Sequence, residues 1–257
     1  MTVTGAVSWP GGRNVRDLGG RALRDGGVTR SGLVFRSAAP EHLTDDGWTA
    51  ARAAGIRTVV DLRNAPTETG RTADHPVIRA DSLDGLVFVA APTEDPDDAE
   101  FLRVCGPWLD HPRSWADNAR LAPARVAGAV RAVAAARPAV LVHCAGGRDR
   151  TGMICAMLLV LAGATADAVI DDYADGWRGA GAHEGHGWVY DLERQVWDKR
   201  RLPSTEPAEL DRQVAERVPA LREWIRTFDT EAFLRSAGLS EPELDTLRAL
   251  LRPLNGS

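Results

Sequence analysis

AVLVHCAGGRDRTG, residues 139–152, is the stretch that decides the fold of this chain. It begins with a continuous apolar run that ends in a His-Cys pair, as in a strand buried on both faces of a parallel sheet. Glycines and charged residues follow. The next segment, TGMICAMLLVLAG (151–163), is apolar on all sides, which is typical of a helix at the centre of a fold. The pattern predicts a buried strand, a loop and a central helix in direct succession.

The flanking sequence alternates between helical and strand patterns. We predict a helix over 43–55 capped by Thr44, strands over 56–63 and 85–90, a helix from Pro123 that ends before Pro138, and a helix that starts after Thr165. RDGG (24–27) predicts a hairpin turn between RAL (21–23) and GLVFR (32–36). The alternation predicts an α/β fold, with a central, mostly parallel sheet flanked by helices.

The C-terminal third predicts additional helices. WVYDLERQVW (188–197) has apolar residues at 188, 189, 192 and 196, on one side of a helix, and Ser240 with Glu243 forms a capping box. We therefore expect extra C-terminal helices, with 176–215 as the candidate for a helical lid within a single domain over 1–257. HEGH (183–186) lies in a turn-like context, and we interpret it as a loop beside the site rather than a metal site.

Composition excludes several classes of protein. The chain has 257 residues, 44% of them hydrophobic, and a net charge of −5 without a long basic tract, which argues against general nucleic-acid binding. No apolar run reaches the roughly 18–20 residues of a membrane span, so we expect no membrane insertion. The start of the chain does not resemble a secretory signal, and its three cysteines lack a metal-binding spacing. We expect a cytoplasmic protein with reduced thiols and no metal or other cofactor.

The cysteine loop has the composition of an anion site with a nucleophile. Gly146 and Gly147 allow backbone N–H groups to converge on one point, and the N-terminus of the following helix adds partial positive charge. Arg148 and Arg150 supply the positive charges that a ligand with two negative charges needs. This field favours the thiolate form of Cys144, which is the nucleophilic form. The alternative is that Cys144 is a small core residue, which explains neither the glycines nor the arginines.

Cys-x5-Arg-Thr after a strand resembles the signature of the cysteine-dependent phosphatase superfamily. Further blocks resemble the bacterial tyrosine-phosphatase-like family, in its order along the chain: NVRDLGG (14–20), LVFRSAAPEHLT (33–44), GIRTVVDLR (55–63), LAGATADAVIDDY (161–173) and FLRSAGLSEPELDTLRALL (233–251). Arg148 stands where many members have lysine, which keeps the charge. Segments 92–120 and 176–188 do not align with the family.

The resemblance implies a cysteine-phosphatase fold and a role for each loop residue. Cys144 attacks phosphorus to give a phosphocysteine, Arg150 holds two equatorial oxygens, and Thr151 donates a hydrogen bond to the thiolate. The phosphate-binding residues are Ala145, Gly146, Gly147, Arg148, Asp149 and Arg150. His143 shapes the loop, and Arg16, Asp17 and Arg63 brace it or reach a distal phosphate, with surface ion pairing as the alternative for these last three.

The leaving oxygen needs a general acid, and three aspartates are candidates. Asp149 lies inside the loop, as in the family, and is the first choice. Asp61 ends a predicted strand, at the edge where α/β active sites form. Asp110, in a proline-rich turn, is the third candidate, although such a turn needs an aspartate for local reasons.

These features favour a metal-independent phosphomonoester hydrolase. Its expected partner is a phosphorylated protein or a small phosphomonoester, and we rank protein phosphotyrosine first. A phosphoinositide, inositol phosphate or dual-specificity phosphatase is the alternative within this chemistry. Outside it, the alternatives are a rhodanese-type sulfurtransferase and a phosphate-binding module without catalysis.

Overall fold

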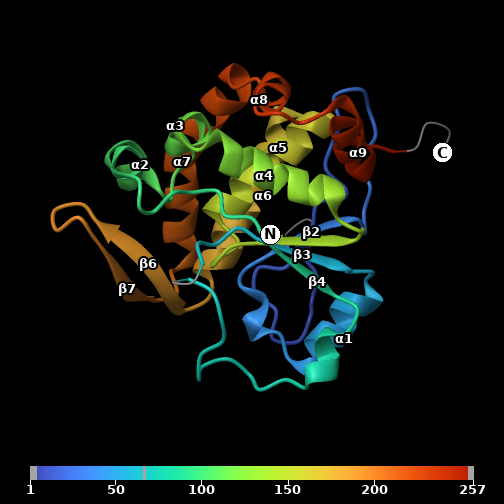
Figure 1. Ribbon diagram of the computed structural model, residues 1–257, viewed down its shortest axis with the longest axis vertical. Helices are drawn as coiled ribbons and strands as arrows, with labels where there is room; N and C mark the ends of the chain where they lie inside the picture. The colour runs from blue at the N-terminus through green and yellow to red at the C-terminus, as the bar shows by residue number, and fades with distance from the viewer. Residues whose placement is uncertain (1–4, 66–67, 254–257) are drawn as a thin grey trace.

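The computed structural model describes residues 5–65 and 68–253, so the two ends of the predicted single domain lie outside the described residues. A five-stranded mixed sheet forms its centre (Figure 1), with the order β1-β2-β5-β3-β4. Its strands are β1 (Arg16–Asp17), β2 (Val34–Ser37), β3 (Thr58–Asp61), β4 (Val87–Ala90) and β5 (Val140–His143). Only the β1–β2 pair is antiparallel among these strands. The predicted mostly parallel sheet is therefore confirmed.

Helices flank both faces of this sheet (Figure 1). One face carries α1 (Asp45–Ala53), and the other carries α4 (Pro123–Ala135) and α5 (Asp149–Ala162), with α6 (Ala166–Gly181) packed on α5. The remaining helices are α2 (Ala99–Cys105), α3 (Trp115–Leu121), α7 (Pro207–Thr227), α8 (Thr230–Ser236) and α9 (Glu241–Leu251), with short 3-10 helices η1 (Pro40–His42), η2 (Ala80–Leu83), η3 (Gly106–Trp108) and η4 (Pro112–Ser114).

Alternate residues of the central strand β5 enter two separate hydrophobic clusters. Val140 and Val142 face the cluster that includes α4 and α5, whereas Leu141 faces the cluster beneath α1. All three side chains are fully buried. Burial on both faces explains why this strand is a continuous apolar run rather than an alternating one.

α5 lies at the centre of the larger cluster, packed against α4, α6, α8 and α9. Twelve of its residues are buried, which accounts for the apolar sequence on all sides. The helix ends at Gly163, which adopts φ +85°. The predicted caps are also present, since Thr44 accepts a hydrogen bond from the Gly47 N–H and Ser240 forms a capping box with Glu243.

Two local predictions were wrong. Residues 188–197 are not helical: β6 (Gly185–Asp191) and β7 (Val196–Leu202) form an antiparallel hairpin that projects from the body (Figure 1), so 176–215 is not a helical lid. The side chain of Asp191 accepts hydrogen bonds from the N–H groups of Glu193 and Arg194, and this closes the turn. The RDGG turn does exist, but the segment before it does not pair with residues 32–36 as predicted. Ala22 pairs with Val28 instead, and β2 pairs with β5.

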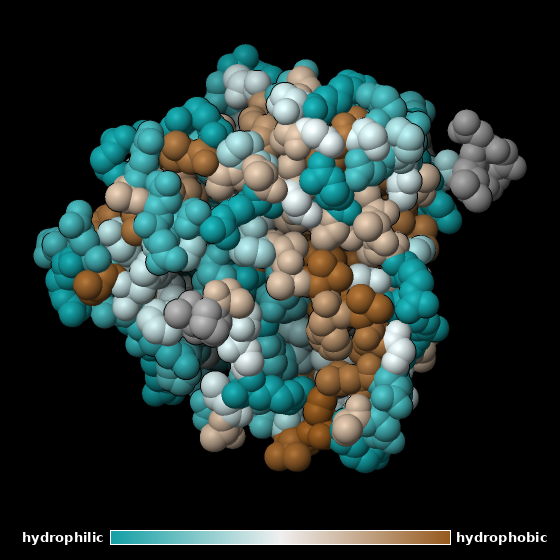
Figure 2. Space-filling view, viewed as in Figure 1, coloured by the Kyte–Doolittle hydropathy of each residue, from teal (hydrophilic) through white to brown (hydrophobic). Residues whose placement is uncertain are grey.

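β4 is the edge strand of the sheet, and its side chains are largely uncovered. Val87 and Phe88 are exposed. Figure 2 shows apolar surface at this edge of the molecule. Among the described residues, no helix is both long and apolar enough to cross a membrane.

Candidate active site

The cysteine loop occupies the edge at which the parallel strands end. His143, the last residue of β5, is in register with Ser37 at the end of β2 and with Asp61 at the end of β3. Cys144 follows directly, and α5 begins at Asp149. The loop therefore lies where α/β sheets bind ligands, between the strand ends and a helix N-terminus.

The loop is pressed against the end of β2. A hydrogen bond of 2.9 Å from the Ala39 N–H to the Ala145 carbonyl joins the two segments. Gly147 adopts φ +66°, and a Cβ atom on it would lie 2.3 Å from the Ser37 carbonyl oxygen. Gly146 has room, because the nearest atom to such a Cβ is 3.7 Å away, on Ala180. Only the second glycine is thus required by close approach.

Gly147→Ala is expected to lower the free energy of unfolding by about 1–3 kcal/mol, because both its φ and the Ser37 carbonyl oppose a side chain. A shifted loop misplaces its N–H groups, so kcat/KM falls at least about 100-fold. Gly146→Ala is the matched control, with a smaller loss of stability. Chemical denaturation and assays of catalytic activity check both, and equal losses in the two variants would contradict this interpretation of the loop.

Asn14 and Arg36 bind the loop from beneath through its carbonyl groups. The Asn14 side-chain amide donates to the carbonyls of Gly146 at 2.9 Å, Gly147 at 3.2 Å and Gly176 at 3.0 Å. Arg36 donates to the Gly147 carbonyl at 2.8 Å. These contacts hold the backbone of the loop in place.

A buried ion pair anchors this network. Arg36 pairs with Asp172 of α6, and both side chains are almost completely buried. Burial by itself raises the pKa of Asp172, but the charges of Arg36, Arg16 and Arg21 outweigh it and hold the pKa below its ordinary value. Asp172 is therefore an ionised carboxylate that fixes Arg36 beneath the loop.

Sequence reasoning missed Asn14, Arg36 and Asp172, although each lies in a block that carries the family resemblance. Arg16 joins the same network: it is buried, it donates to the Asn14 side-chain oxygen and to the Asp175 carbonyl, and burial lowers its pKa to about 10. This places Arg16 under the loop rather than at its open side.

Asp17 lies in a turn beside this network. Its carboxylate accepts hydrogen bonds from the N–H groups of Gly19 at 2.8 Å and Gly32 at 2.7 Å. The side chain therefore closes the connection between β1 and β2, and its contacts are to backbone groups rather than to the loop.

Two glutamates that sequence reasoning missed hold the guanidinium of Arg150. Glu68 accepts from both terminal nitrogens, at 2.6 and 3.1 Å, and Glu94 lies 3.5 Å away. Burial raises the pKa of Glu94, with a further contribution from Glu68, although Arg150 opposes the shift. The bidentate contact fixes the plane of Arg150.

Asp149 and Arg148 form a second charged group at the start of α5. Arg148 Nε donates to one Asp149 oxygen at 2.8 Å, while the other buried oxygen has no hydrogen-bond partner among the described residues. Burial raises the pKa of Asp149, and Asp110 adds to the shift, whereas Arg148 opposes it. Asp149 is thus a carboxyl group that keeps its proton to higher pH than an exposed aspartate.

Arg148 is itself fixed by aromatic and charged neighbours. Its guanidinium lies 4.2 Å from the ring centre of Trp177, and Arg217 of α7 lies 3.7 Å from the same centre. Asp110 accepts from Arg217 at 3.4 Å and lies 3.8 Å from Arg148. The structure therefore brings Asp110 near the loop, at the exposed end of this stack.

Asp61 is engaged by Arg63 through both carboxylate oxygens, at 2.9 and 2.7 Å. Burial raises the pKa of Asp61, but the hydrogen bonds and the positive charge of Arg63 outweigh it, so the net shift is downward. Arg63 also pairs with Glu41 at 2.6 Å. The Asp61 carboxylate is ionised and fully occupied, which makes it a poor proton donor.

His143 is completely enclosed beside Cys144. Burial lowers its pKa, so the ring is neutral, and its Nδ1 lies 3.2 Å from the Cys144 carbonyl. We assign the proton to Nδ1, because only a donor can bond to a carbonyl. The ring therefore fixes the peptide group of Cys144.

The three cysteines are free thiols in very different surroundings. Burial raises the pKa of both Cys105 and Cys155 to about 12, so these two stay protonated and inert. Of the three, only Cys144 lies in the cysteine loop, where it is 4% exposed. In the first turn of α5, the buried hydroxyl of Thr151 has no hydrogen-bond partner among the described residues.

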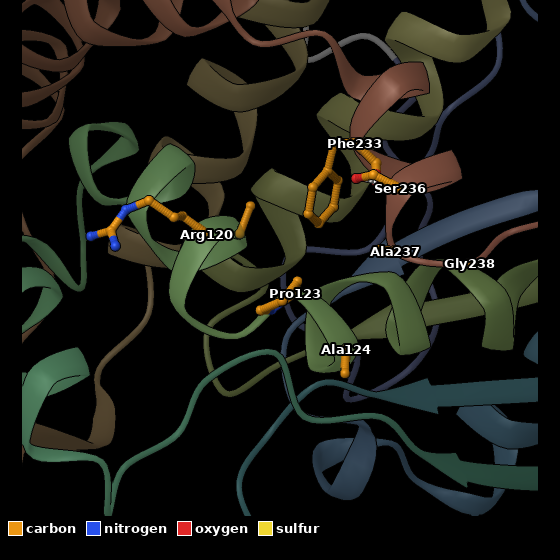
Figure 3. Close-up of a pocket in the computed structure, with 8 residues that line it drawn as sticks. Arg120, Pro123, Ala124, Phe233, Ser236, Ala237 and Gly238 are labelled. Atoms are coloured by element: carbon orange, nitrogen blue, oxygen red, sulfur yellow. Dashed lines mark hydrogen bonds between the residues drawn. The ribbon is translucent and has the colours of Figure 1, made fainter.

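No group of three or more potential metal ligands occurs among the described residues, HEGH included. A shallow cavity of about 630 Å³ lies elsewhere, between α3, α4 and α8 (Figure 3). In this cavity Phe233 points toward Pro123, while Arg120 extends away from both. The charged groups described above, apart from Asp17 and Arg120, gather around the cysteine loop, so the loop is the candidate active site.

Known proteins are similar to this chain in sequence. The sequence model of the tyrosine phosphatase family matches residues 7–253. Triple specificity protein phosphatase PtpB of Mycobacterium tuberculosis is 29% identical over 276 residues, covering 94% of the chain and 97% of PtpB.

Two solved structures are similar at low sequence identity. P. aeruginosa TpbA in complex with pTyr has a TM-score of 0.41 and 15% identity, over 82% of the chain and 88% of TpbA. The core catalytic domain of the PP-IP phosphatase SIW14 from S. cerevisiae has a TM-score of 0.41 and 12% identity, over 90% and 94%. The family match over nearly the whole chain confirms the resemblance predicted from the sequence: the chain belongs to the tyrosine phosphatase family.

Proposed function

We propose that this protein hydrolyses phosphotyrosine in proteins, with Cys144 as nucleophile and Asp149 as general acid. The observation that carries the proposal is the juxtaposition in one loop of a cysteine, a fixed arginine and a carboxyl group with a raised pKa. Attack by the Cys144 sulfur on phosphorus forms an S–P bond and breaks the P–O bond to the tyrosine. Water then attacks the phosphocysteine and releases inorganic phosphate and the thiolate.

Arg150 binds the equatorial oxygens of the phosphoryl group in this scheme. Glu68 engages the two terminal nitrogens of the guanidinium end-on, so the edge formed by Nε remains for substrate. Because its orientation is fixed before substrate arrives, little reorganisation is needed during the reaction. The N–H groups of residues 145–150 supply the remaining hydrogen bonds.

Thr151 and His143 support the sulfur in the same scheme. The buried Thr151 hydroxyl lacks a partner among the described residues, and the thiolate that departs in the second step is a suitable acceptor. Burial keeps His143 neutral, which suits a positioning role rather than proton transfer.

Because all three cysteines are reduced, we place the protein in the cytoplasm.

Asp149 is the best general acid of the three aspartates. Its raised pKa keeps the proton available, its second oxygen is unengaged among the described residues, and the loop itself carries it. Asp61 is held ionised by Arg63, and Asp110 lies at the exposed end of the Trp177 stack. A tyrosine leaving group has a pKa near 10 and therefore needs a proton as it departs.

Asp149→Asn is expected to lower kcat for a phosphotyrosine peptide about 100-fold. The loss should be smaller for p-nitrophenyl phosphate, because its leaving group is a stable anion. In the native protein, activity falls as pH rises through the pKa of Asp149, because the acid loses its proton. This fall is the basic limb of the pH–rate profile. The variant has no such acid, so its profile should lack the basic limb.

Asp61→Asn and Asp110→Asn serve as controls in the same measurement. Both should keep the basic limb, whatever their overall activity. Loss of the limb in one of these two and not in Asp149→Asn would move the role of acid to that residue.

The other classes of function are separated by simple assays. Hydrolysis of p-nitrophenyl phosphate in the presence of EDTA supports the phosphatase, thiosulfate-dependent formation of thiocyanate supports a sulfurtransferase, and phosphate binding without turnover supports a binding module. A panel of phosphopeptides and phosphoinositides then ranks the substrates. We expect phosphopeptides to have the higher kcat/KM, and a reversed order would assign the protein to lipid phosphates.

A further inference from the structure

A group of basic side chains adjoins the cysteine loop and takes no part in the chemistry proposed above. It consists of Arg13, the histidine pair His42 and His75, and Arg71, which we call the basic rim. Two backbone hydrogen bonds connect it to the loop: the Ala38 N–H donates to the Arg13 carbonyl at 3.0 Å, and the next N–H donates to the Ala145 carbonyl at 2.9 Å. The rim is therefore next to the residue that follows the nucleophile.

The two arginines of the rim donate their side-chain hydrogen bonds to backbone carbonyls. Arg13 donates to the Glu184 carbonyl at 3.0 Å, and Arg71 donates to the carbonyls of Glu41 at 3.1 Å and Pro76 at 2.7 Å. Neither has a carboxylate partner among the described residues. Four other arginines near the loop, Arg63, Arg148, Arg150 and Arg217, lie within ion-pair distance of a carboxylate.

Between these arginines, the two histidine rings pack edge to face, with centres 4.6 Å apart. The Thr72 N–H donates to His75 Nδ1 at 2.9 Å, so in the neutral ring the proton is on Nε2, which is a donor. His42 has its pKa lowered to about 4, first by burial and then by the positive charge of Arg13, although the Glu41 carboxylate opposes the shift. A bound anion would offset the charge of Arg13 beside this pair.

We propose that the basic rim binds a negatively charged side chain next to the phosphotyrosine of a peptide substrate. This rests on the proposed function, because it names the class of peptide that the same active site prefers. The whole chain has a net charge of −5, so an acidic peptide has no general attraction to it and needs local positive charge. Unpaired guanidinium groups are the side chains best suited to binding carboxylate or phosphate.

The experiment compares two synthetic phosphotyrosine peptides, one with glutamates and one with serines beside the phosphotyrosine. We expect kcat/KM for the acidic peptide to exceed that for the neutral one at least about threefold at low ionic strength. In Arg13→Gln combined with Arg71→Gln the ratio should fall toward one. Because the ratio is taken within each protein, a general loss of activity or of folded protein cancels.

Arg57→Gln is the matched control. Arg57 is also a surface arginine that donates to backbone carbonyls, those of Arg52 and Ile56, but it lies at the opposite end of β3 from the loop. The ratio should keep its native value in this variant. If Arg57→Gln lowers the ratio as much as the rim variant does, the effect is one of overall charge and the proposal is wrong.

The histidines add a dependence on pH that a purely structural role lacks. The charged or titratable groups facing the pair are Arg13, Arg71, His183, Glu41 and Asp74. A bound anion favours the protonated rings, so the complex takes up protons. Because both rings have lowered pKa values, the acidic-to-neutral ratio should rise as pH falls below about 6.5 toward 4.5. In His42→Gln with His75→Gln this rise should disappear.

Three further outcomes would overturn the proposal: equal kcat/KM for the two peptides in the native protein, a native ratio that survives the loss of both rim arginines, or a pH-dependence unchanged by loss of the histidines. Each is separate from the proposed function, which is tested by hydrolysis of the neutral peptide. Hydrolysis of both peptides at the same rate would support the phosphatase function but would show that the basic rim does not bind an acidic side chain.

Discussion

Cys144→Ser is expected to abolish turnover while the protein still binds phosphate. The serine hydroxyl is far less nucleophilic at neutral pH than a thiolate, and no other group of the loop can form the covalent intermediate. Loss of a nucleophile of this kind costs more than about 10⁴-fold in kcat. The hydrogen-bond donors and Arg150 remain in place, so isothermal titration with inorganic phosphate should still detect binding.

Cys105→Ala is the matched control for this prediction. Cys105 is buried, with its pKa raised to about 12, and lies in α2 away from the loop. Its replacement should leave p-nitrophenyl phosphate hydrolysis in EDTA close to the native rate. A Cys144→Ser protein that keeps even about a tenth of the native rate would exclude Cys144 as the nucleophile.

Arg36→Met is expected to cause the largest loss of stability. The substitution leaves Asp172 buried without its main partner and removes a donor from the Gly147 carbonyl. Breaking one side of a buried ion pair costs about 3–5 kcal/mol in the free energy of unfolding. Urea unfolding of the two proteins measures the difference.

Arg79→Met provides the contrast, because Arg79 pairs with Asp81 in an ion pair that is 68% exposed on both sides. We expect no measurable change there. The double replacement Arg36→Met with Asp172→Leu should recover part of the loss, since no unpaired charge remains. Equal midpoints for Arg36→Met and Arg79→Met would show that the buried network does not stabilise the loop.

The sequence predicted those parts of the fold that depend on local patterns. The apolar run before Cys144 and the apolar helix after it identified β5 and α5, and Thr44 marked the start of α1. The hairpin at 185–202 was missed because its apolar spacing also fits a helix. In the structure Tyr190 pairs with Trp197. Gln195 adopts φ +53° in the turn, and a glutamine does not predict this left-handed conformation.

The residues of the candidate site fall into two groups: those within one short motif and those from distant parts of the chain. Cys144, Asp149 and Arg150 are one contiguous motif, so their spacing alone indicates their chemistry. Glu68 and Glu94 reach Arg150 from 82 and 56 positions away along the chain, and no spacing rule relates them to it. Groups that the tertiary fold brings together become apparent only once the sheet order is known.

Trapping of the covalent intermediate tests the central claim most directly. The native protein is mixed with a phosphotyrosine peptide, quenched in acid during turnover, digested and analysed by mass spectrometry. We expect one phosphoryl group on the peptide that contains Cys144, attached to sulfur, and none in the Cys144→Ser protein. A phosphoryl group on a different residue, or native turnover without any phosphoenzyme under quench conditions that preserve phosphocysteine, would contradict this account.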